Sequence, residues 1–365
     1  MRVLALVTDA FGGTGGIAQY NRDFLAALAA ADTVSDVLVL PRQAQPFTDA
    51  LPKTLRQLPP IHARIPYSLE AYRVSRALPR ADVIFCGHIF MSPLAAFLAR
   101  RHRARLWIQT HGIDAWEPYT GIARVAARTA DLITCVSRFT RDRLLAWLDL
   151  EPWRVRVLPN TVGEGFTPGP APAALRERYQ LGTRRVLLTI SRLWAGDRYK
   201  GHDRVIAALP DLLRAGADVA YLIVGSGDDV PRLEQVAAMK GVGERVIFAG
   251  GVSSHELADH YRLADVFIMP SIKEGFGIVF LEAAACGIPV IGGNRDGSWD
   301  ALREGRLGRA IDPDDEHQLL EAVLTALERG KAPDTTPVDV FRRQRFTSHV
   351  AELARELSAS PRRAS

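Results

Sequence analysis

The chain has 365 residues, of which 47% are hydrophobic and 24% charged, which is typical of a soluble globular protein. This length favours two domains, no apolar run approaches a membrane span, and three widely spaced cysteines exclude a disulfide framework and fit a reducing cytoplasm. The net charge of +5 is uneven: residues 1–163 hold 20 of the 46 basic and 13 of the 41 acidic side chains, which indicates an anionic partner for this half.

The chain opens with a buried parallel strand over residues 3–7, a loop with four glycines, and a helix over residues 18–30. Strand, glycine loop and helix form a phosphate-binding arrangement, because the start of the helix offers unpaired N–H groups. A Rossmann dinucleotide loop is the alternative. Gly13 and Gly15 would then need a third glycine at Ala18, so we discount NAD.

An alternation of strands and helices continues through the first half. Strand-like runs recur at residues 37–40, 83–86, 106–109 and 132–136, and residues 155–162 form a strand that ends in a turn. Helical stretches lie between most of them, for example at residues 93–100 and 139–148. The pattern predicts a doubly wound parallel sheet, in which ligands bind at the carboxyl ends of the strands. His88 and His111 each follow a strand directly and are therefore candidate site residues.

Residues 50–80 interleave basic side chains with isoleucine, leucine and tyrosine, and residues 100–105 add a dense basic cluster. A solvated surface is the common explanation for such stretches. A peripheral contact with an anionic membrane is the alternative, in which each basic residue contributes about 1 kcal/mol. The composition leaves both interpretations open.

A proline-rich segment at residues 165–173 has the composition of a linker. We therefore expect one domain over residues 1–163 and a second over residues 164–341. The second half repeats the alternation, with strand-like runs at residues 185–191, 219–224, 246–249, 266–270 and 289–292 and helical runs at 278–286, 316–328 and 341–357. The pattern thus predicts two α/β halves joined by a linker.

The stretch of residues 271–282 joins the end of a strand to the start of a helix. Gly275 and Gly277 flank one phenylalanine, so the backbone can turn sharply and approach a ligand, and the helix start suits a phosphate. Glu274 and Glu282 would repel a phosphate, whereas sugar hydroxyls suit them. A nucleotide sugar offers both groups. An ordinary loop with two solvated glutamates is the alternative.

This stretch resembles the E-x7-E signature of retaining glycosyltransferases of family 4, which have the GT-B fold and include bacterial polysaccharide-biosynthesis enzymes. The resemblance implies that Glu274 contacts the donor sugar and Glu282 the ribose. It implies two Rossmann-like domains facing a cleft, with a C-terminal helix over residues 342–365 that packs back on the first domain. The backbone amides that would hold the diphosphate belong to Gly275, Phe276, Gly277 and Ile278.

Further family landmarks occur in order along the chain. Arg192 and Lys200 resemble an Arg…Lys-Gly pair that stabilises the departing diphosphate. His111 resembles a histidine that reaches the donor sugar or the reaction centre, and His88 and Asp114 are candidates for the acceptor side. Other resemblances to donor or nucleotide contacts fall at Gly15, Gly16, Gly225 and Val252.

We interpret other acidic residues of the second half as helix caps. Asp300 stands where the family usually has glutamate, and it can cap the following helix. The run from Asp312 to Asp315 directly precedes a predicted helix, so capping is favoured over metal binding. No catalytic metal and no cofactor are expected, only the nucleotide sugar as co-substrate.

The resemblance implies a retaining, metal-independent hexosyltransferase. It would move a sugar from GDP-mannose or a UDP-hexose to a hydroxyl of a lipid-linked saccharide in exopolysaccharide or lipopolysaccharide assembly. The expected location is the cytoplasm or the inner face of the plasma membrane, and nucleic acid is not an expected partner. A soluble small-molecule glycosyltransferase and a GT-B sugar-nucleotide epimerase or phosphorylase are the alternatives.

Overall fold

The computed structural model describes residues 1–45, 50–332 and 334–359. The chain divides into two compact units. Unit 1 takes Met1–Thr161 with the C-terminal segment from Arg343, and unit 2 takes Val162–Arg342. Over the described residues, no helix combines the length and the apolar character that a membrane span requires.

Unit 1 is built on a seven-stranded parallel sheet with the strand order β3-β2-β1-β4-β5-β6-β7. Its strands are β1 (Arg2–Val7), β2 (Asp36–Pro41), β3 (Leu55–Gln57), β4 (Val83–Cys86), β5 (Arg105–Thr110), β6 (Leu132–Cys135) and β7 (Val155–Val157). The order of the strands reverses between β1 and β4. In doubly wound sheets, ligands bind at such a reversal, beyond the carboxyl ends of the strands.

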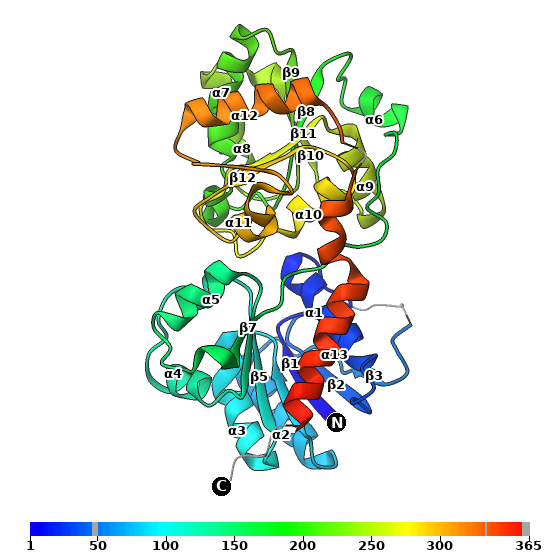
Figure 1. The fold of residues 1–365 in the computed structure, drawn as a ribbon, viewed down its shortest axis with the longest axis vertical. Helices are drawn as coiled ribbons and strands as arrows, with labels where there is room; N and C mark the ends of the chain where they lie inside the picture. The colour runs from blue at the N-terminus through cyan, green and yellow to red at the C-terminus, as the bar shows by residue number, and fades with distance from the viewer. Residues whose placement is uncertain (46–49, 333, 360–365) are drawn as a thin grey trace. The chain divides into compact units, whose positions relative to one another are not determined.

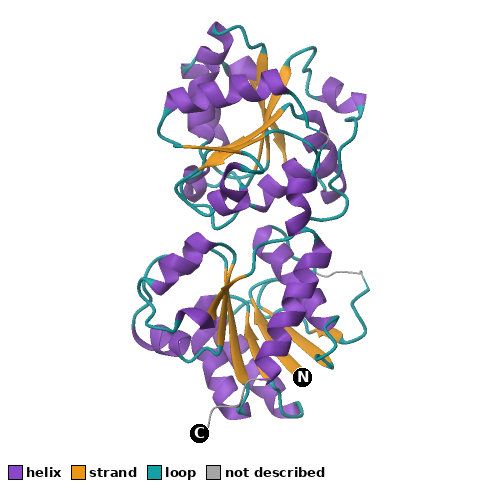
Figure 2. Ribbon diagram, viewed as in Figure 1, coloured by secondary structure: helices purple, strands orange, loops and turns teal. Residues whose placement is uncertain are grey.

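Helices cover both faces of this sheet (Figure 2). They are α1 (Gly16–Ala29), α2 (Arg64–Ala77), α3 (Ser92–His102), α4 (Gly121–Arg128), α5 (Arg138–Leu145) and α13 (Arg343–Ala359), with short 3-10 turns η1 (Ile89–Met91), η2 (Ile113–Ala115) and η3 (Pro152–Arg154). Phe85 of β4 stacks on Phe24 of α1 with ring centroids 4.3 Å apart. Its strand neighbours Ile84 and Cys86 instead join a core cluster with Leu98 of α3. Each face of the strand thus has its own helices, as the alternation of side chains requires.

The C-terminal helix α13 packs against α1 within unit 1 (Figure 1). Phe346 meets Tyr20 edge to face at 5.9 Å, and Arg343 pairs with Asp23 at 3.1 Å. The buried residues of α13 follow a helical period and make one apolar stripe: Phe346, Val350, Leu353, Ala354 and Leu357. The last residues of the predicted segment, 360–365, lie outside the described residues.

Unit 2 is built on a six-stranded parallel sheet with the order β10-β9-β8-β11-β12-β13. Its strands are β8 (Arg185–Ile190), β9 (Val219–Val224), β10 (Val246–Gly250), β11 (Val266–Met269), β12 (Val290–Gly293) and β13 (Arg309–Ile311). Its helices are α6 (Ala173–Arg178), α7 (His202–Arg214), α8 (Val230–Met239), α9 (Ser254–Leu263), α10 (Ile278–Ala285), α11 (Ser298–Ala301) and α12 (Glu316–Arg329), with 3-10 turns η4 (Ala195–Lys200), η5 (Gly243–Arg245), η6 (Arg303–Gly305) and η7 (Thr336–Phe341). Both units are therefore α/β with parallel sheets, as predicted.

The acidic residues of unit 2 test the capping predictions. Asp315 is the N-cap of α12 and accepts a hydrogen bond from the Gln318 amide at 3.0 Å, which confirms the capping role. The prediction for Asp300 was wrong. Asp300 lies inside the short helix α11, whose N-cap is Gly297. The carboxylate that binds the first amide of this helix, Ser298 N at 2.9 Å, is that of Asp296.

Candidate active site

The turn into α10 shapes the loop that follows β11. Gly277 is the N-cap of α10 and has φ +89°, and a Cβ added there would lie 2.5 Å from ring atoms of Phe280. Glycine is required at this position because an L side chain would meet both strain and a clash. Gly275 does not lie in the left-handed region, so the sharp turn falls on Gly277 alone. Phe276 is buried against Phe341, with ring centroids 5.6 Å apart.

Glu274 and Lys200 form an ion pair across this loop. Their side chains are 18% and 14% exposed, so the pair lies in a partly desolvated place. Lys200 is brought there by η4, because the Ile272 amide donates to the Tyr199 carbonyl at 3.1 Å. The predicted cation and the predicted carboxylate therefore meet, although 74 residues separate them.

Glu282 lies on α10 and is 5% exposed. The hydroxyl of Tyr261, on α9, donates to Glu282 Oε2 at 2.7 Å. Burial raises the pKa of the Glu282 carboxyl to about 7, and the hydrogen bond from Tyr261 opposes that rise. Tyr261 thus fixes one oxygen of a carboxylate that is otherwise costly to bury.

The other predicted donor-side residues lie at the carboxyl ends of neighbouring strands. Arg192 follows β8, lies 4.7 Å over the Trp194 ring and pairs with Asp197 at 3.0 Å. Gly225 follows β9 with φ +144°, where a Cβ would come within 1.8 Å of a backbone oxygen after β8. Val252 lies in the loop after β10. The parallel sheet thus places all these residues at one edge of unit 2.

In unit 1, His111 follows β5 and Nε2 of its ring lies 2.9 Å from the Gly87 carbonyl. A carbonyl only accepts hydrogen bonds, so Nε2 carries the proton and Nδ1 is left as an acceptor. Burial lowers the pKa of His111 to about 4, with the bond to Gly87 opposing. His111 is therefore a neutral imidazole at pH 7.

His88 and Asp114 lie beside His111. The Asp114 carboxylate accepts the His111 amide at 2.9 Å, while its other oxygen, Oδ2, lies 3.8 Å from His88 Nε2. Among the described residues that oxygen has no hydrogen-bond partner. His88 Nδ1 accepts from the Phe90 amide, so its Nε2 carries a proton. Burial raises the pKa of Asp114 to about 7 and, with His111 nearby, lowers that of His88 to about 3.

The glycine loop after β1 ends at Gly15 and Gly16, where α1 begins. Gly15 has φ +86°, and no described atom lies within 4 Å of a Cβ built on either glycine. Arg22 holds the loop by donating to the carbonyls of Ala10 at 3.2 Å and Gly13 at 2.6 Å. The loop is thus anchored on one side and open on the other.

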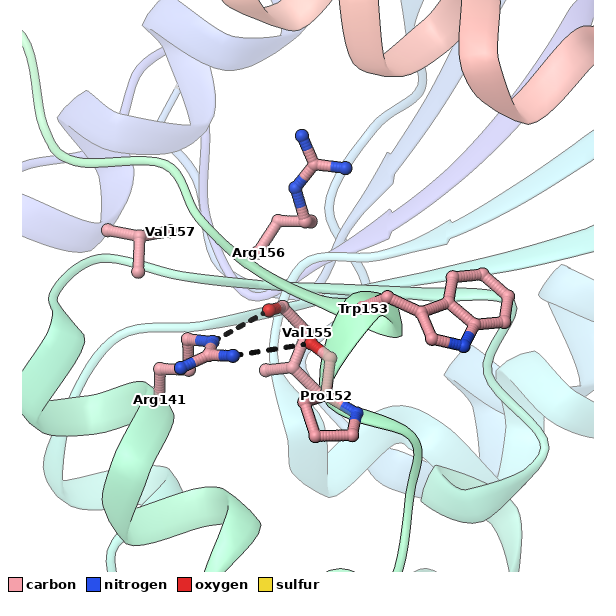
Figure 3. A pocket seen from close by; sticks show the side chains of 6 residues that line it. All are labelled: Arg141, Pro152, Trp153, Val155, Arg156 and Val157. Carbon is pink, nitrogen blue, oxygen red and sulfur yellow. Dashed lines mark hydrogen bonds between the residues drawn. The ribbon is translucent and has the colours of Figure 1, made fainter.

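A pocket at the edge strand β7 is not part of this constellation. Arg141 donates to the Val155 carbonyl at 2.9 Å and to the Pro152 carbonyl at 3.4 Å there (Figure 3). The residues that line the pocket include none of the predicted site residues: Arg141, Pro152, Trp153, Val155, Arg156 and Val157. Among the described residues, no group of three or more His, Cys, Asp or Glu side chains is arranged to hold a metal ion.

The sequence interpretation missed two residues that contact the predicted glutamates. Tyr261 lies in a helix that carried no site signal. Asp296 accepts the Glu274 amide at 2.6 Å, and burial raises its pKa to about 6. The glycine-rich turn after β12 was the available signal for Asp296, but only the structure shows what it faces.

Two family models match the chain. One, described as Glycosyltransferase Family 4, covers residues 14–163, and the other, described as Glycosyl transferases group 1, covers residues 174–336. The chain is 36% identical over 283 residues to a GDP-mannose-dependent alpha-(1-6)-phosphatidylinositol monomannoside mannosyltransferase of Mycolicibacterium smegmatis. The match covers 73% of this chain and 72% of that protein. It is 31% identical over 347 residues to the protein of the same name from Mycobacterium tuberculosis, with 89% of each chain covered.

Solved structures share the fold. The sucrose-phosphate synthase of Thermosynechococcus elongatus matches 99% of this chain and 100% of its own with a TM-score of 0.78 and 21% identity. Anabaena HepE in complex with UDP matches 98% and 100% with a TM-score of 0.75 and 20% identity. The fold is therefore GT-B, and the chain belongs to glycosyltransferase family 4, as an enzyme that uses a nucleotide sugar.

Proposed function

We propose that this enzyme transfers mannose from GDP-mannose to a hydroxyl of a lipid-linked saccharide, with retention of anomeric configuration and without a divalent metal. The observation that carries the proposal is the Glu274–Lys200 ion pair in unit 2, in the loop that leads into α10, the helix that carries the buried Glu282. The names of the two mycobacterial relatives support GDP-mannose over a UDP-hexose. They also favour a phosphatidylinositol-linked saccharide over the exopolysaccharide or lipopolysaccharide acceptors expected from the sequence.

The chemistry follows from the charges at this edge. When the donor binds, Lys200 leaves its ion pair with Glu274 and pairs with the diphosphate instead. Glu274 can then accept hydrogen bonds from the sugar. The bond from the anomeric carbon to the phosphate oxygen breaks, and the acceptor oxygen bonds to that carbon on the same face. The departing phosphate oxygen takes the acceptor proton. Arg192, Lys200 and the α10 amides stabilise the charge that develops on the diphosphate, so no carboxylate nucleophile and no metal are needed.

The acceptor side is assigned to unit 1. The second oxygen of Asp114 and the protonated Nε2 of His88 offer one hydrogen-bond acceptor and one donor 3.8 Å apart. A hydroxyl both donates and accepts, so it suits this pair. His111 Nδ1 offers a further hydrogen-bond acceptor in unit 1.

A panel of GDP-, UDP-, ADP- and dTDP-sugars with phosphatidylinositol mannoside acceptors tests the proposal. We expect turnover with GDP-mannose alone, undiminished by EDTA, and an α-linked product by NMR. Lys200→Ala should lower kcat at least about 100-fold, because it removes the cation that stabilises the negative charge of the departing diphosphate. Lys273→Ala, an exposed lysine one residue from Glu274, should stay within twofold. No transfer from any donor, or equal losses in both variants, would refute the proposal.

One observation favours a second candidate acceptor. The chain is 32% identical over 258 residues to a D-inositol 3-phosphate glycosyltransferase of Geodermatophilus obscurus, although it spans only 55% of that protein. A soluble inositol phosphate is therefore the alternative to the lipid-linked acceptor. Transfer of mannose to the soluble inositol phosphate in the absence of lipid would favour this alternative.

We further propose that unit 1 contacts an anionic membrane through an α2–α3 surface, defined by Ile65 and Leu69 of α2 and Phe97 of α3 with the arginines around them. These three residues are 74%, 64% and 54% exposed. Arg101 lies 5.3 Å over the Tyr72 ring beside Phe97. Exposed apolar side chains together with a cation such as Arg101 fit a bilayer with anionic lipids, and the inner face of the plasma membrane is the proposed location.

Co-sedimentation with vesicles tests this surface. We expect binding to vesicles with phosphatidylinositol or phosphatidylglycerol, none to pure phosphatidylcholine, and a decline with salt. The double variant Ile65→Ser/Leu69→Ser should weaken binding at least about tenfold. Burial of each apolar side chain contributes about 1.5–3 kcal/mol of binding free energy. The matched control is Ile122→Ser/Val125→Ser on α4, where the side chains are 75% and 63% exposed. Equal losses of binding in the α2 and α4 double variants would show nonspecific hydrophobic adsorption and contradict this surface.

A further inference from the structure

The loop that carries Glu274 is held from behind by a second loop, the turn of residues 294–298 between β12 and α11. We call this turn the bracket. Asp296, at its centre, is 1% exposed and uses both carboxylate oxygens. Oδ2 accepts the Glu274 amide at 2.6 Å and the Ser271 hydroxyl at 2.9 Å, and Oδ1 accepts the Ser298 amide at 2.9 Å.

Backbone contacts add to these bonds. The Gly297 amide donates to the Glu274 carbonyl at 2.8 Å, so the bracket binds both sides of the Glu274 backbone. A Cβ on Gly297 would lie 2.0 Å from the Gly275 carbonyl oxygen, and one on Gly293 would lie 2.1 Å from that of Ser271. Two glycines thus let the loops touch backbone to backbone.

The bracket has its own anchor on the opposite side. Arg295 pairs with Asp312 at 2.6 Å and with Asp314 at 2.5 Å, and Asp314 also pairs with Arg204 at 2.7 Å. These carboxylates lie in the loop after β13, and their ion pairs are with Arg295 and Arg204. Neighbouring residues of the bracket thus make contacts in two places: Arg295 pairs with Asp312 and Asp314, and Asp296 binds the loop of residues 271–277.

No ion pair to Asp296 occurs among the residues that the structure describes. A buried carboxylate without a cation is costly, so its position calls for a reason beyond stability. Two hydrogen-bond donors of the Glu274 loop, the Glu274 amide and the Ser271 hydroxyl, bind Asp296, and the Ser298 amide holds the carboxylate in place. The direction of the Glu274 side chain follows from the backbone of this loop.

We propose that Asp296 is a positioning residue for transfer, which sets where the Glu274 carboxylate meets the donor sugar. It touches neither the nucleotide nor the reacting atoms and acts through the Glu274 backbone. The proposal rests on the proposed function, in which Glu274 binds the sugar of the donor. A misplacement of about 1 Å in such a group costs on the order of 100-fold in rate.

The test is Asp296→Asn. The variant keeps the shape of the side chain, but its NH2 group cannot accept a hydrogen bond, so one of the N–H donors loses its acceptor. We expect kcat with GDP-mannose to fall about 30- to 100-fold, with the donor KM raised less than about threefold. Affinity for GDP alone, measured by calorimetry, should stay within twofold, because the nucleotide does not contact Glu274 in this scheme. A residue that only stabilises the fold would not split kcat from GDP affinity in this way.

Asp314→Asn is the matched control, since it weakens the ion pairs of Asp314 with Arg295 and Arg204 and leaves the hydrogen bonds of Asp296 in place. We expect its kcat to stay within twofold of the wild type. Ser271→Ala removes one donor to Asp296 and provides a milder variant should Asp296→Asn fail to fold; its kcat should fall about three- to tenfold. A kcat within twofold for both Asp296→Asn and Ser271→Ala, or an equal loss in Asp314→Asn, would overturn the proposal.

Hydrogen exchange separates this proposal from the proposed function. In Asp296→Asn the amide of Glu274 should exchange at least about tenfold faster, and in Asp314→Asn it should not. A wild-type enzyme that transfers no sugar would refute the proposed function while this contact remained measurable. Unchanged exchange at Glu274 would instead refute the role of Asp296, whatever the substrate.

Discussion

Glu282 is the residue whose protonation state the structure makes most consequential. Burial raises the pKa of its carboxyl to about 7, and the Tyr261 hydroxyl holds it lower than burial alone would. In the proposed function Glu282 accepts hydrogen bonds from the ribose hydroxyls, and an ionised carboxylate accepts them more strongly than a protonated carboxyl. We therefore expect the donor KM to rise as the pH falls below about 7, while it stays flat at higher pH.

Tyr261→Phe tests this dependence with the loss of one oxygen atom. The variant removes the hydrogen bond that favours the ionised Glu282, so its pKa should rise further and the increase in donor KM should begin at a higher pH. Donor KM measured from pH 5.5 to 8.5 provides the comparison. Tyr179→Phe, which deletes a hydroxyl bonded to His260 at 2.8 Å, is the control and should keep the wild-type midpoint. Superimposable profiles for wild type and Tyr261→Phe would contradict the assignment.

The residues that sequence could supply and those it could not differ in a physical way. Glu274, Lys200 and Glu282 stand at motif spacings, so their chemical type and order sufficed to single them out. Asp296 and Tyr261 matter because of what they face after folding. Asp296 meets Glu274 from 22 positions further along the chain, and no local pattern encodes that distance.

At the scale of elements, the long strands were predictable because their buried runs are continuous and bounded by turn residues. Strands β3 and β13 were missed, and each has only three residues. The third three-residue edge strand, β7, was predicted, because it lies in the strand-like run of residues 155–162 that ends in a turn. Helix α2 was interpreted only as a basic stretch, because its exposed Ile65 and Leu69 blur the division between an apolar and a polar face.

Helix α13 provides a prediction at this scale, because its apolar stripe packs on α1 in unit 1. Phe346 is 5% exposed and contacts Tyr20, so Phe346→Ala should lower the free energy of unfolding of unit 1 by about 3–5 kcal/mol. Urea denaturation followed by tryptophan fluorescence measures the change. Ser348→Ala, on the exposed side of the same helix, should stay within about 0.5 kcal/mol. A small effect of Phe346→Ala would mean that α13 adds little to the stability of unit 1.

At the scale of the whole molecule, each unit has its own sheet and its own buried core. The donor-side residues predicted from the sequence belong almost entirely to unit 2. Gly15, Gly16 and His111 are the exceptions in unit 1. The sequence predicted two α/β halves because the alternation restarts after a proline-rich segment. That Gly15 and Gly16 of unit 1 sense the nucleotide stays a prediction from the family resemblance.

Hydrogen exchange with and without GDP addresses that question. A ligand at about 100 times its Kd adds about 2.7 kcal/mol to the stability of what it binds, which slows exchange through unfolding about 100-fold. We expect this protection in strands β8 to β12 and at the start of α10, and much less in the sheet of unit 1. Protection at the Gly15–Gly16 peptide is the sensitive point, since it would show that this glycine loop senses the nucleotide as the family resemblance implies. Protection of unit 2 without Gly15 and Gly16 would restrict nucleotide binding to unit 2, and protection centred on unit 1 would contradict the assignment of the donor site.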